Sequence, residues 1–143
     1  MKIYKISHKF NIVYHGTDQE SANDIINNGI DSSKFLGGYF GFAFYTTPYP
    51  NLAKSNYADF SEDNDGVVLE FSINPDAKIL DLRDPDDFNE YKLTNHPRYY
   101  NTLEGSLRIY NEFGIDAIYD RSNDSVMIFN PKILKFNGIY ENI

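Results

Sequence analysis

Residues 37–47 read GGYFGFAFYTT, a run of aromatic and small side chains that decides which fold the rest of the chain must build. Aromatic residues are enriched in strands, and a short apolar run bounded by glycine and proline is typical of a buried strand. The Pro-Tyr-Pro sequence at residues 48–50 ends this strand, because proline has no backbone N–H for a sheet ladder. We therefore expect a buried strand over residues 39–47, followed by a small helix near residues 52–57.

Upstream of this strand the sequence predicts another strand and a helix. Residues 10–14 alternate weakly and are rich in β-formers, and this strand is expected to stop at the tripeptide of residues 15–17. From Asp18, an expected N-cap, apolar residues recur at helical spacing as far as Gly29, whose tolerance of positive φ suits a helix end. The pattern therefore places His15 at a strand end, directly before an amphipathic helix.

Downstream the sequence predicts two more strands and one more helix. Residues 66–73 and 78–82 are β-like, and residues 102–113 carry apolar side chains at near-helical spacing before Gly114. Two acidic stretches that are rich in helix and strand breakers are interpreted as surface loops or helix starts, at residues 59–66 and 81–87.

The final third predicts hairpins that complete an antiparallel sheet, with strands over residues 116–120, 125–130 and 133–140. The order strand, helix, strand, helix and then strands is typical of an α+β fold. A length of 143 residues is about one domain's worth, so residues 1–143 are expected to form a single domain.

Composition excludes several classes of protein. The chain has no cysteine, which excludes disulfide scaffolds, thiolate metal sites and cysteine nucleophiles, and permits a cytoplasmic location. Thirteen Lys and Arg stand against twenty-one Asp and Glu, and the formal charge of −8 disfavours a broad electrostatic grip on nucleic acid or anionic lipid. No stretch approaches the roughly 18 apolar residues of a membrane span, so we expect no membrane partner. We also expect a monomer.

Of the three histidines, His15 is the candidate functional residue, and no common catalytic or metal-binding motif accompanies it. No phosphate-cradling, zincin or hydrolase motif is present, and a calcium-like spacing over residues 61–72 has serine at its first and twelfth positions, so no metal site is expected. His8 and His96 are interpreted as surface residues. His15 differs because Gly16 and Thr17 follow it. The glycine lets a ligand approach the backbone closely, and the threonine adds a hydroxyl group.

Four segments stand in an order that goes beyond composition: HGT at residues 15–17, NGI at 28–30, GYFGFAFY at 38–45 and KSNY at 54–57. Together they resemble the poly(ADP-ribose) polymerase-like, diphtheria-toxin-type ADP-ribosyltransferases, which carry HG[ST], a helix ending in Gly-Leu or Gly-Ile, a GYxFGxGxY strand and a helix with a second tyrosine. Residues 114–119 and 126–131 resemble the closing strands of small bacterial relatives. The resemblance covers about residues 12–136.

The resemblance implies a split, mostly antiparallel sheet that binds NAD as co-substrate between its halves and transfers ADP-ribose with release of nicotinamide. It implies that Tyr45 and Tyr57 hold the nicotinamide, a cationic ring that gains ~1–2 kcal/mol between desolvated aromatic faces. The backbone of Gly16 would pair with the nicotinamide amide, and His15 would hydrogen-bond the ribose on the adenine side. Thr17 belongs to the same binding set.

The sequence departs from the pattern where the transferases carry a catalytic glutamate. That residue stands four positions before an aromatic, and counting back from Phe129 places Ser125 there. Asp124 is adjacent, but neighbouring residues of a strand point to opposite faces. Ala43 also replaces the second motif glycine, and the step to Tyr57 is slightly longer than usual.

Three interpretations follow from the missing glutamate. The chain is a mono-ADP-ribosyltransferase in which the substrate's own carboxylate helps, an enzyme that uses Asp124, or an inactive relative that only binds NAD or ADP-ribose. The first is our prediction, with His15, Tyr45 and Ser125 as catalytic residues and a protein or nucleic-acid acceptor. The resemblance suggests a toxin or effector that acts in the cytoplasm, including that of a target cell.

A carbohydrate-binding or structural all-β domain is the alternative from a different class. In that case the aromatic residues would serve packing or sugar contacts, and His15 would be satisfied in a core. This all-β alternative requires that residues 19–28 and 102–113 do not form the expected helices.

Overall fold

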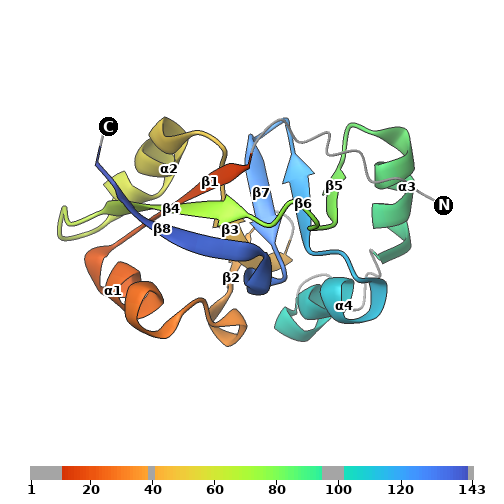
Figure 1. Ribbon diagram of the computed structural model, residues 1–143, viewed down its shortest axis with the longest axis horizontal. Coiled ribbons are helices and arrows are strands. Elements are labelled where there is room, and N and C mark those ends of the chain that lie inside the picture. The colour runs from red at the N-terminus through yellow and green to blue at the C-terminus, as the bar shows by residue number, and fades with distance from the viewer. Residues whose placement is uncertain (1–10, 39–40, 95–101, 142–143) are drawn as a thin grey trace.

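The computed structural model describes residues 11–38, 41–94 and 102–141, which form two β-sheets with helices around them (Figure 1). The α-helices of these ranges are α1 (Gln19–Asn28), α2 (Pro50–Asn56), α3 (Pro85–Thr94) and α4 (Leu103–Phe113). The strands are β1 (Ile12–Thr17), β2 (Leu36–Gly38), β3 (Gly41–Thr46), β4 (Val67–Ile73), β5 (Ile79–Asp81), β6 (Ala117–Asp120), β7 (Ser125–Ile128) and β8 (Leu134–Tyr140). Short 3-10 turns are η1 (Ser32–Lys34), η2 (Ala58–Phe60) and η3 (Pro131–Ile133).

The strands divide into a three-stranded sheet in the order β1-β4-β8 and a five-stranded sheet in the order β2-β3-β7-β6-β5. All pairings are antiparallel except that of β5 with β6, which is parallel. Helices and largely antiparallel sheets occur together, so the α+β prediction is confirmed. The two helices that an all-β interpretation would have to remove are present as α1 and α4.

One isolated β-bridge joins the two sheets in the described part of the chain. The backbone N–H of Tyr14 donates to the carbonyl of Thr47 over 2.8 Å, and that of Thr47 donates back over 3.0 Å. Beyond this bridge β1 pairs with β4, whereas β3 pairs with β7, so the sheets separate. The split sheet therefore begins next to His15, one residue after the bridge.

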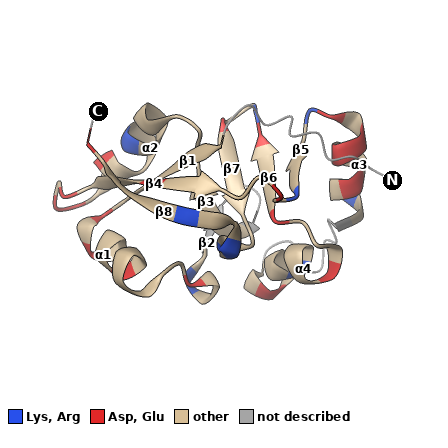
Figure 2. Ribbon diagram, viewed as in Figure 1, with Lys and Arg blue, Asp and Glu red and all other residues tan. Residues whose placement is uncertain are grey.

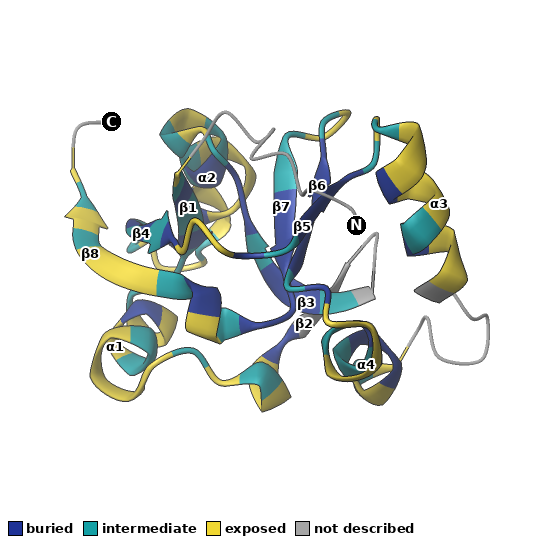
Figure 3. Cartoon of the chain, turned by 45° about the vertical axis from the view of Figure 1, so that its right-hand side comes forward, coloured by how far each residue is buried: buried dark blue, intermediate teal, exposed yellow. Residues whose placement is uncertain are grey.

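Two clusters of buried side chains cover the two faces of the five-stranded sheet. The cluster between the sheets includes Val13, Phe44, Leu69, Phe71 and Val126. The opposite cluster joins β5, β6 and β7 to α3 and α4 and includes Leu80, Tyr91, Ile109, Ile118 and Met127. Figure 3 shows these strands in the dark blue of buried residues and much of α1 and β8 exposed. Burial of each large apolar side chain stabilises the fold by about 1.5–3 kcal/mol.

The helix ends follow the predicted capping signals. The side chain of Asp18 accepts a hydrogen bond from the Ser21 N–H over 2.6 Å at the start of α1. Thr102 does the same for the Gly105 N–H over 2.9 Å at the start of α4. Gly114 ends α4 in the left-handed conformation at φ 68°, which glycine adopts without steric cost.

Two expectations about secondary structure need correction, and a third is met in part. β1 does not stop at residues 15–17 but includes them, because Gly16 and Thr17 still pair with β4. β8 does not extend a hairpin from β7: η3 turns the chain to the other sheet, where β8 pairs with β4. The acidic stretch at residues 81–87, interpreted as a surface loop or helix start, does include the start of α3, whose acidic first turn favours a helix N-terminus (Figure 2), although Asp81 and Asp87 are buried.

Some predictions fall outside the described residues, namely the start of the first strand at residue 10, residues 39 and 40 of the aromatic strand, and the surface positions of His8 and His96. Within residues 11–38, 41–94 and 102–141, no helix is both long enough and apolar enough to cross a membrane.

Candidate functional site

A cavity of about 1020 Å³ opens where the two sheets separate. That volume is at the upper end of typical ligand pockets. Its walls come from β1, from α1 and η1, from β3, from the end of α2 and from the β6–β7 hairpin. All six residues expected to bind or act lie along it: His15, Gly16, Thr17, Tyr45, Tyr57 and Ser125.

His15 is oriented by two contacts with β3. Its Nδ1 lies 2.7 Å from the carbonyl oxygen of Tyr45, and its ring stacks on Phe44 with centroids 4.0 Å apart and planes inclined by 22°. A carbonyl oxygen only accepts hydrogen bonds, so Nδ1 carries the proton and Nε2 keeps its lone pair. Nε2 has no hydrogen-bond partner among the described residues and is free to accept from a ligand hydroxyl.

Burial keeps the imidazole of His15 neutral. Desolvation lowers the pKa of His15 from 6.5 to about 4, although the hydrogen bond to the Tyr45 carbonyl acts in the opposite direction. At neutral pH the ring is therefore an uncharged acceptor at Nε2. Such a group can accept a hydrogen bond from a hydroxyl without placing a positive charge in the cavity.

Tyr57 and Ser125 meet at the cavity. Tyr57 is the C-cap of α2 and is 38% exposed. Its hydroxyl shares a hydrogen bond with Ser125, which partly offsets the rise in the Tyr57 pKa that burial causes. The structure thus brings Tyr57 next to Ser125, although the two residues are far apart in the sequence.

Gly16 is required for packing against α2. A Cβ at Gly16 would lie 2.0 Å from the Ala53 carbonyl oxygen and 2.9 Å from the Ala58 backbone nitrogen. Gly66, directly before β4, would place a Cβ 1.9 Å from the Ala58 carbonyl oxygen. Backbone atoms cannot retreat as a flexible side chain does, so glycine is needed on the α2 side of the sheet whether or not a ligand approaches Gly16 from the cavity.

The β6–β7 turn contributes polar groups that sequence reasoning missed. Asp120, Ser122 and Asn123 line the cavity beside Ser125. Asp124 is not among the lining residues and has a positive φ of 50° in the turn. The signal that finds Asp120 is strand register, because it pairs with Ser125, and that register follows only once the hairpin length is known.

The α1 end of the cavity carries the other charges. Lys34 Nζ lies 3.0 Å from Asp24 Oδ2, and this contact raises the pKa of Lys34. Hydrogen bonds from Asn28 and Lys34 lower the pKa of Asp24. Exposed ion pairs contribute little to stability, so Lys34 can turn toward a bound anion at small cost.

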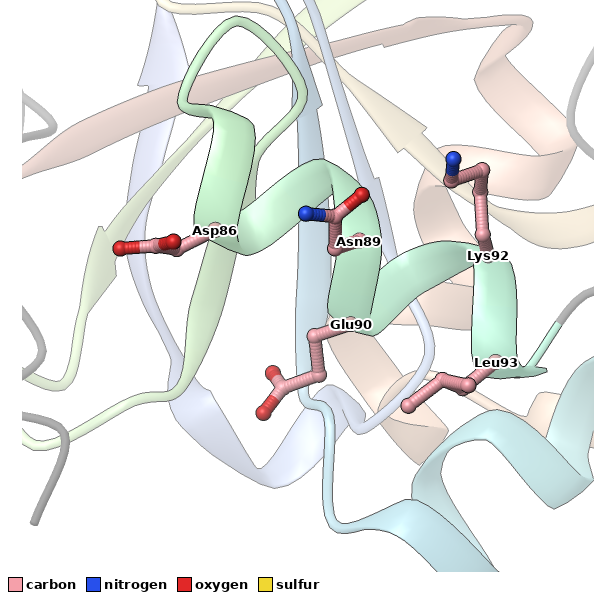
Figure 4. A pocket seen from close by; sticks show the side chains of 5 residues that line it. All are labelled: Asp86, Asn89, Glu90, Lys92 and Leu93. Carbon is pink, nitrogen blue, oxygen red and sulfur yellow. The ribbon is translucent and has the colours of Figure 1, made fainter.

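A second hollow of about 550 Å³ lies along α3 (Figure 4). It is lined by Asp86, Asn89, Glu90, Lys92 and Leu93. Figure 4 shows Asp86 pointing away from the other four, so these side chains do not converge on one ligand position. The cavity between the sheets is the better candidate site because it combines depth with convergent polar groups.

No protein-family model matches the chain. No curated protein matches it significantly.

Proposed function

We propose that the chain is an NAD-dependent mono-ADP-ribosyltransferase, which moves ADP-ribose from NAD to a macromolecular acceptor and releases nicotinamide. The observation that carries the proposal is that His15 and Tyr45, thirty positions apart, line one cavity, where Nδ1 of His15 lies 2.7 Å from the backbone carbonyl oxygen of Tyr45. Tyr57 and Ser125 reach the same cavity from other elements. This is the combination that the resemblance to poly(ADP-ribose) polymerase-like transferases calls for.

The chemistry of the lining groups suits a dinucleotide with a cationic ring. Tyr45 and Tyr57 both line the cavity, and an aromatic ring face against the pyridinium would contribute ~1–2 kcal/mol when desolvated. Neutral His15 accepts a hydrogen bond from a ribose hydroxyl through Nε2. Lys34 supplies a positive charge for the diphosphate at the α1 end.

The reaction needs orientation and charge stabilisation more than a nucleophile. As the bond between C1′ of the ribose and the pyridinium nitrogen breaks, its electron pair moves to nitrogen and nicotinamide leaves as a neutral molecule. Positive charge then develops on the ribose. A rigid site that fixes both ends of NAD lowers the barrier because the substrate reaches the reactive geometry on binding.

An inactive NAD-binding or ADP-ribose-binding module is the second candidate. The specific observation in its favour is the hydroxyl of Ser125 at the position where these transferases carry a carboxylate. A hydroxyl can hydrogen-bond a ribose but carries no negative charge to face an oxocarbenium ion.

Incubation with NAD labelled on its adenylate part, together with cell lysate, separates the two candidates. The transferase releases nicotinamide and passes the label to an acceptor, whereas the module binds NAD and does neither. Tyr45→Ala should abolish NAD binding, and Tyr49→Ala is the matched control because Tyr49 is 50% exposed and does not line the cavity. A Tyr45→Ala protein that binds and turns over NAD like the parent would show the site assignment to be wrong.

For the acceptor, we propose only its class, a protein or a nucleic acid. The charge of −8 argues for a local contact with the acceptor over a broad electrostatic grip on a phosphate backbone. We place the reaction in the cytoplasm, that of a target cell included, and assign it to a monomer. The lack of cysteine is compatible with this reducing environment.

A further inference from the structure

Asp120 places a carboxylate beside Ser125, the residue that stands where the proposed function calls for a carboxylate. It ends β6, is 5% exposed and pairs directly with Ser125 on β7. Residues directly opposite each other in an antiparallel pair point to the same face, with Cβ atoms ~4.5–5.5 Å apart. Both residues line the cavity, so the carboxylate of Asp120 lies one strand away from the hydroxyl of Ser125.

Three hydrogen bonds hold this carboxylate in one orientation. Oδ1 accepts from the Ser122 N–H over 3.1 Å and from the Ser122 hydroxyl over 2.5 Å. Oδ2 accepts from the Asn123 amide over 2.7 Å. A carboxylate has about four acceptor positions, so capacity for a further contact remains. A charge fixed in this way needs no reorganisation when an opposite charge develops nearby.

The other acids around the cavity do not meet these conditions. Asp124 adjoins Ser125 in sequence but does not line the cavity. Asp24 and Asp31 lie at the α1 end, where Asp24 pairs with Lys34 and Asp31 accepts from Ser33. Among the described residues, Asp120 is the carboxylate that lines the cavity on the side of Ser125 and Tyr57.

We infer that Asp120 is a catalytic residue, which faces the nicotinamide ribose and supplies the negative charge that Ser125 does not. The inference rests on the proposed function. The C1′–N bond breaks with its electron pair going to nicotinamide, and Asp120 stabilises the positive charge left on the ribose. The acceptor then forms a bond to C1′ through a lone pair and loses its proton to the solvent. With water as acceptor the products are ADP-ribose, nicotinamide and one proton.

Asp120→Asn tests the inference because it removes the charge and keeps the shape. The asparagine oxygen can still accept from the Ser122 N–H, and the Asn123 amide can rotate to offer its oxygen to the new NH₂ group. We expect kcat for nicotinamide release to fall about 100-fold, as when one electrostatic contact to a transition state is lost. The dissociation constant for NAD and the unfolding temperature should change little. Asp124→Asn, the same substitution outside the cavity, should leave kcat unchanged.

A second variant keeps the test decisive if Asp120→Asn alters the turn. Adding Ser125→Glu to Asp120→Asn returns a carboxylate to the opposite strand, and nicotinamide release should recover. A merely structural Asp120 would not be rescued in this way. The inference is overturned if Asp120→Asn keeps the parental kcat, if Ser125→Glu brings no recovery, or if the parent binds NAD without releasing nicotinamide. A parent that does not bind NAD instead refutes the proposed function itself.

Discussion

Acid should weaken the fold through His15, and the effect has a defined pH window. The pKa of His15 is lowered from 6.5 to about 4 by burial in the folded chain. Between these values the unfolded chain binds a proton at His15 that the folded chain does not. Stability therefore falls as the pH drops from 6.5 toward 4, and no part of this effect is present at pH 8.

The size of the effect follows from the two pKa values. The full gap between 6.5 and about 4 corresponds to about 3 kcal/mol, and at pH 5 the linkage relation gives about 2 kcal/mol. Because the ring of His15 also lines the cavity and retains some contact with solvent, we take 2 kcal/mol as the upper end of the expected loss at pH 5. Carboxylates titrate in the same range, so the total change in stability does not isolate His15.

Urea unfolding at pH 8 and at pH 5 isolates the histidine when the parent is compared with His15→Gln. Glutamine cannot be protonated, and it retains an N–H that can reach the Tyr45 carbonyl. We expect the parent to lose up to about 2 kcal/mol more than the variant between these pH values. NMR titration of His15 should give a midpoint near 4. Parallel losses in the two proteins, together with a midpoint near 6.5, would refute the argument.

Two further predictions concern packing and charge around the site. Gly16→Ala should destabilise the fold by about 3 kcal/mol, because its Cβ would overlap the Ala53 carbonyl, and an unchanged urea midpoint would contradict the packing argument. Arg121→Met should cost about 2 kcal/mol, because it removes the guanidinium 2.6 Å from the buried carboxylate of Asp81. Adding Asp81→Asn should recover most of that loss in thermal unfolding, and an additive loss would argue against a direct pair.

Local signals in the sequence predict most of the helices and strands. Asp18 and Gly29 bound α1 as their capping preferences predict, and Thr102 and Gly114 do the same for α4. The aromatic strand is found because its apolar run is short and bounded by breakers. These features depend on residues within a few positions of one another, so the sequence alone contains the necessary information.

Contacts between distant segments could not be predicted in the same way. After η3, β8 pairs with β4 in the three-stranded sheet and not with the sheet that contains β7. Which sheet has an unpaired edge at that point depends on the whole fold, so no local sequence pattern predicts it. The sequence suggests a ligand contact as the reason for glycine at residue 16. The structure shows a stronger requirement, because a Cβ there would overlap the backbone of Ala53 on α2. The place of Asp120 opposite Ser125 depends on the register of a hairpin, which no local sequence pattern specifies.

The width of the candidate site is set by the backbone at one place. The mutual hydrogen bonds of Tyr14 and Thr47 hold β1 against the end of β3, and the next residue, His15, spans the widening gap with a side-chain bond to the Tyr45 carbonyl. Without the hydrogen bond to that carbonyl, the proton of the neutral ring could lie on either nitrogen, and Nε2 would no longer be fixed as a hydrogen-bond acceptor. The same contact therefore links the two sheets where they begin to separate and leaves Nε2 of the uncharged ring able to accept a hydrogen bond at neutral pH.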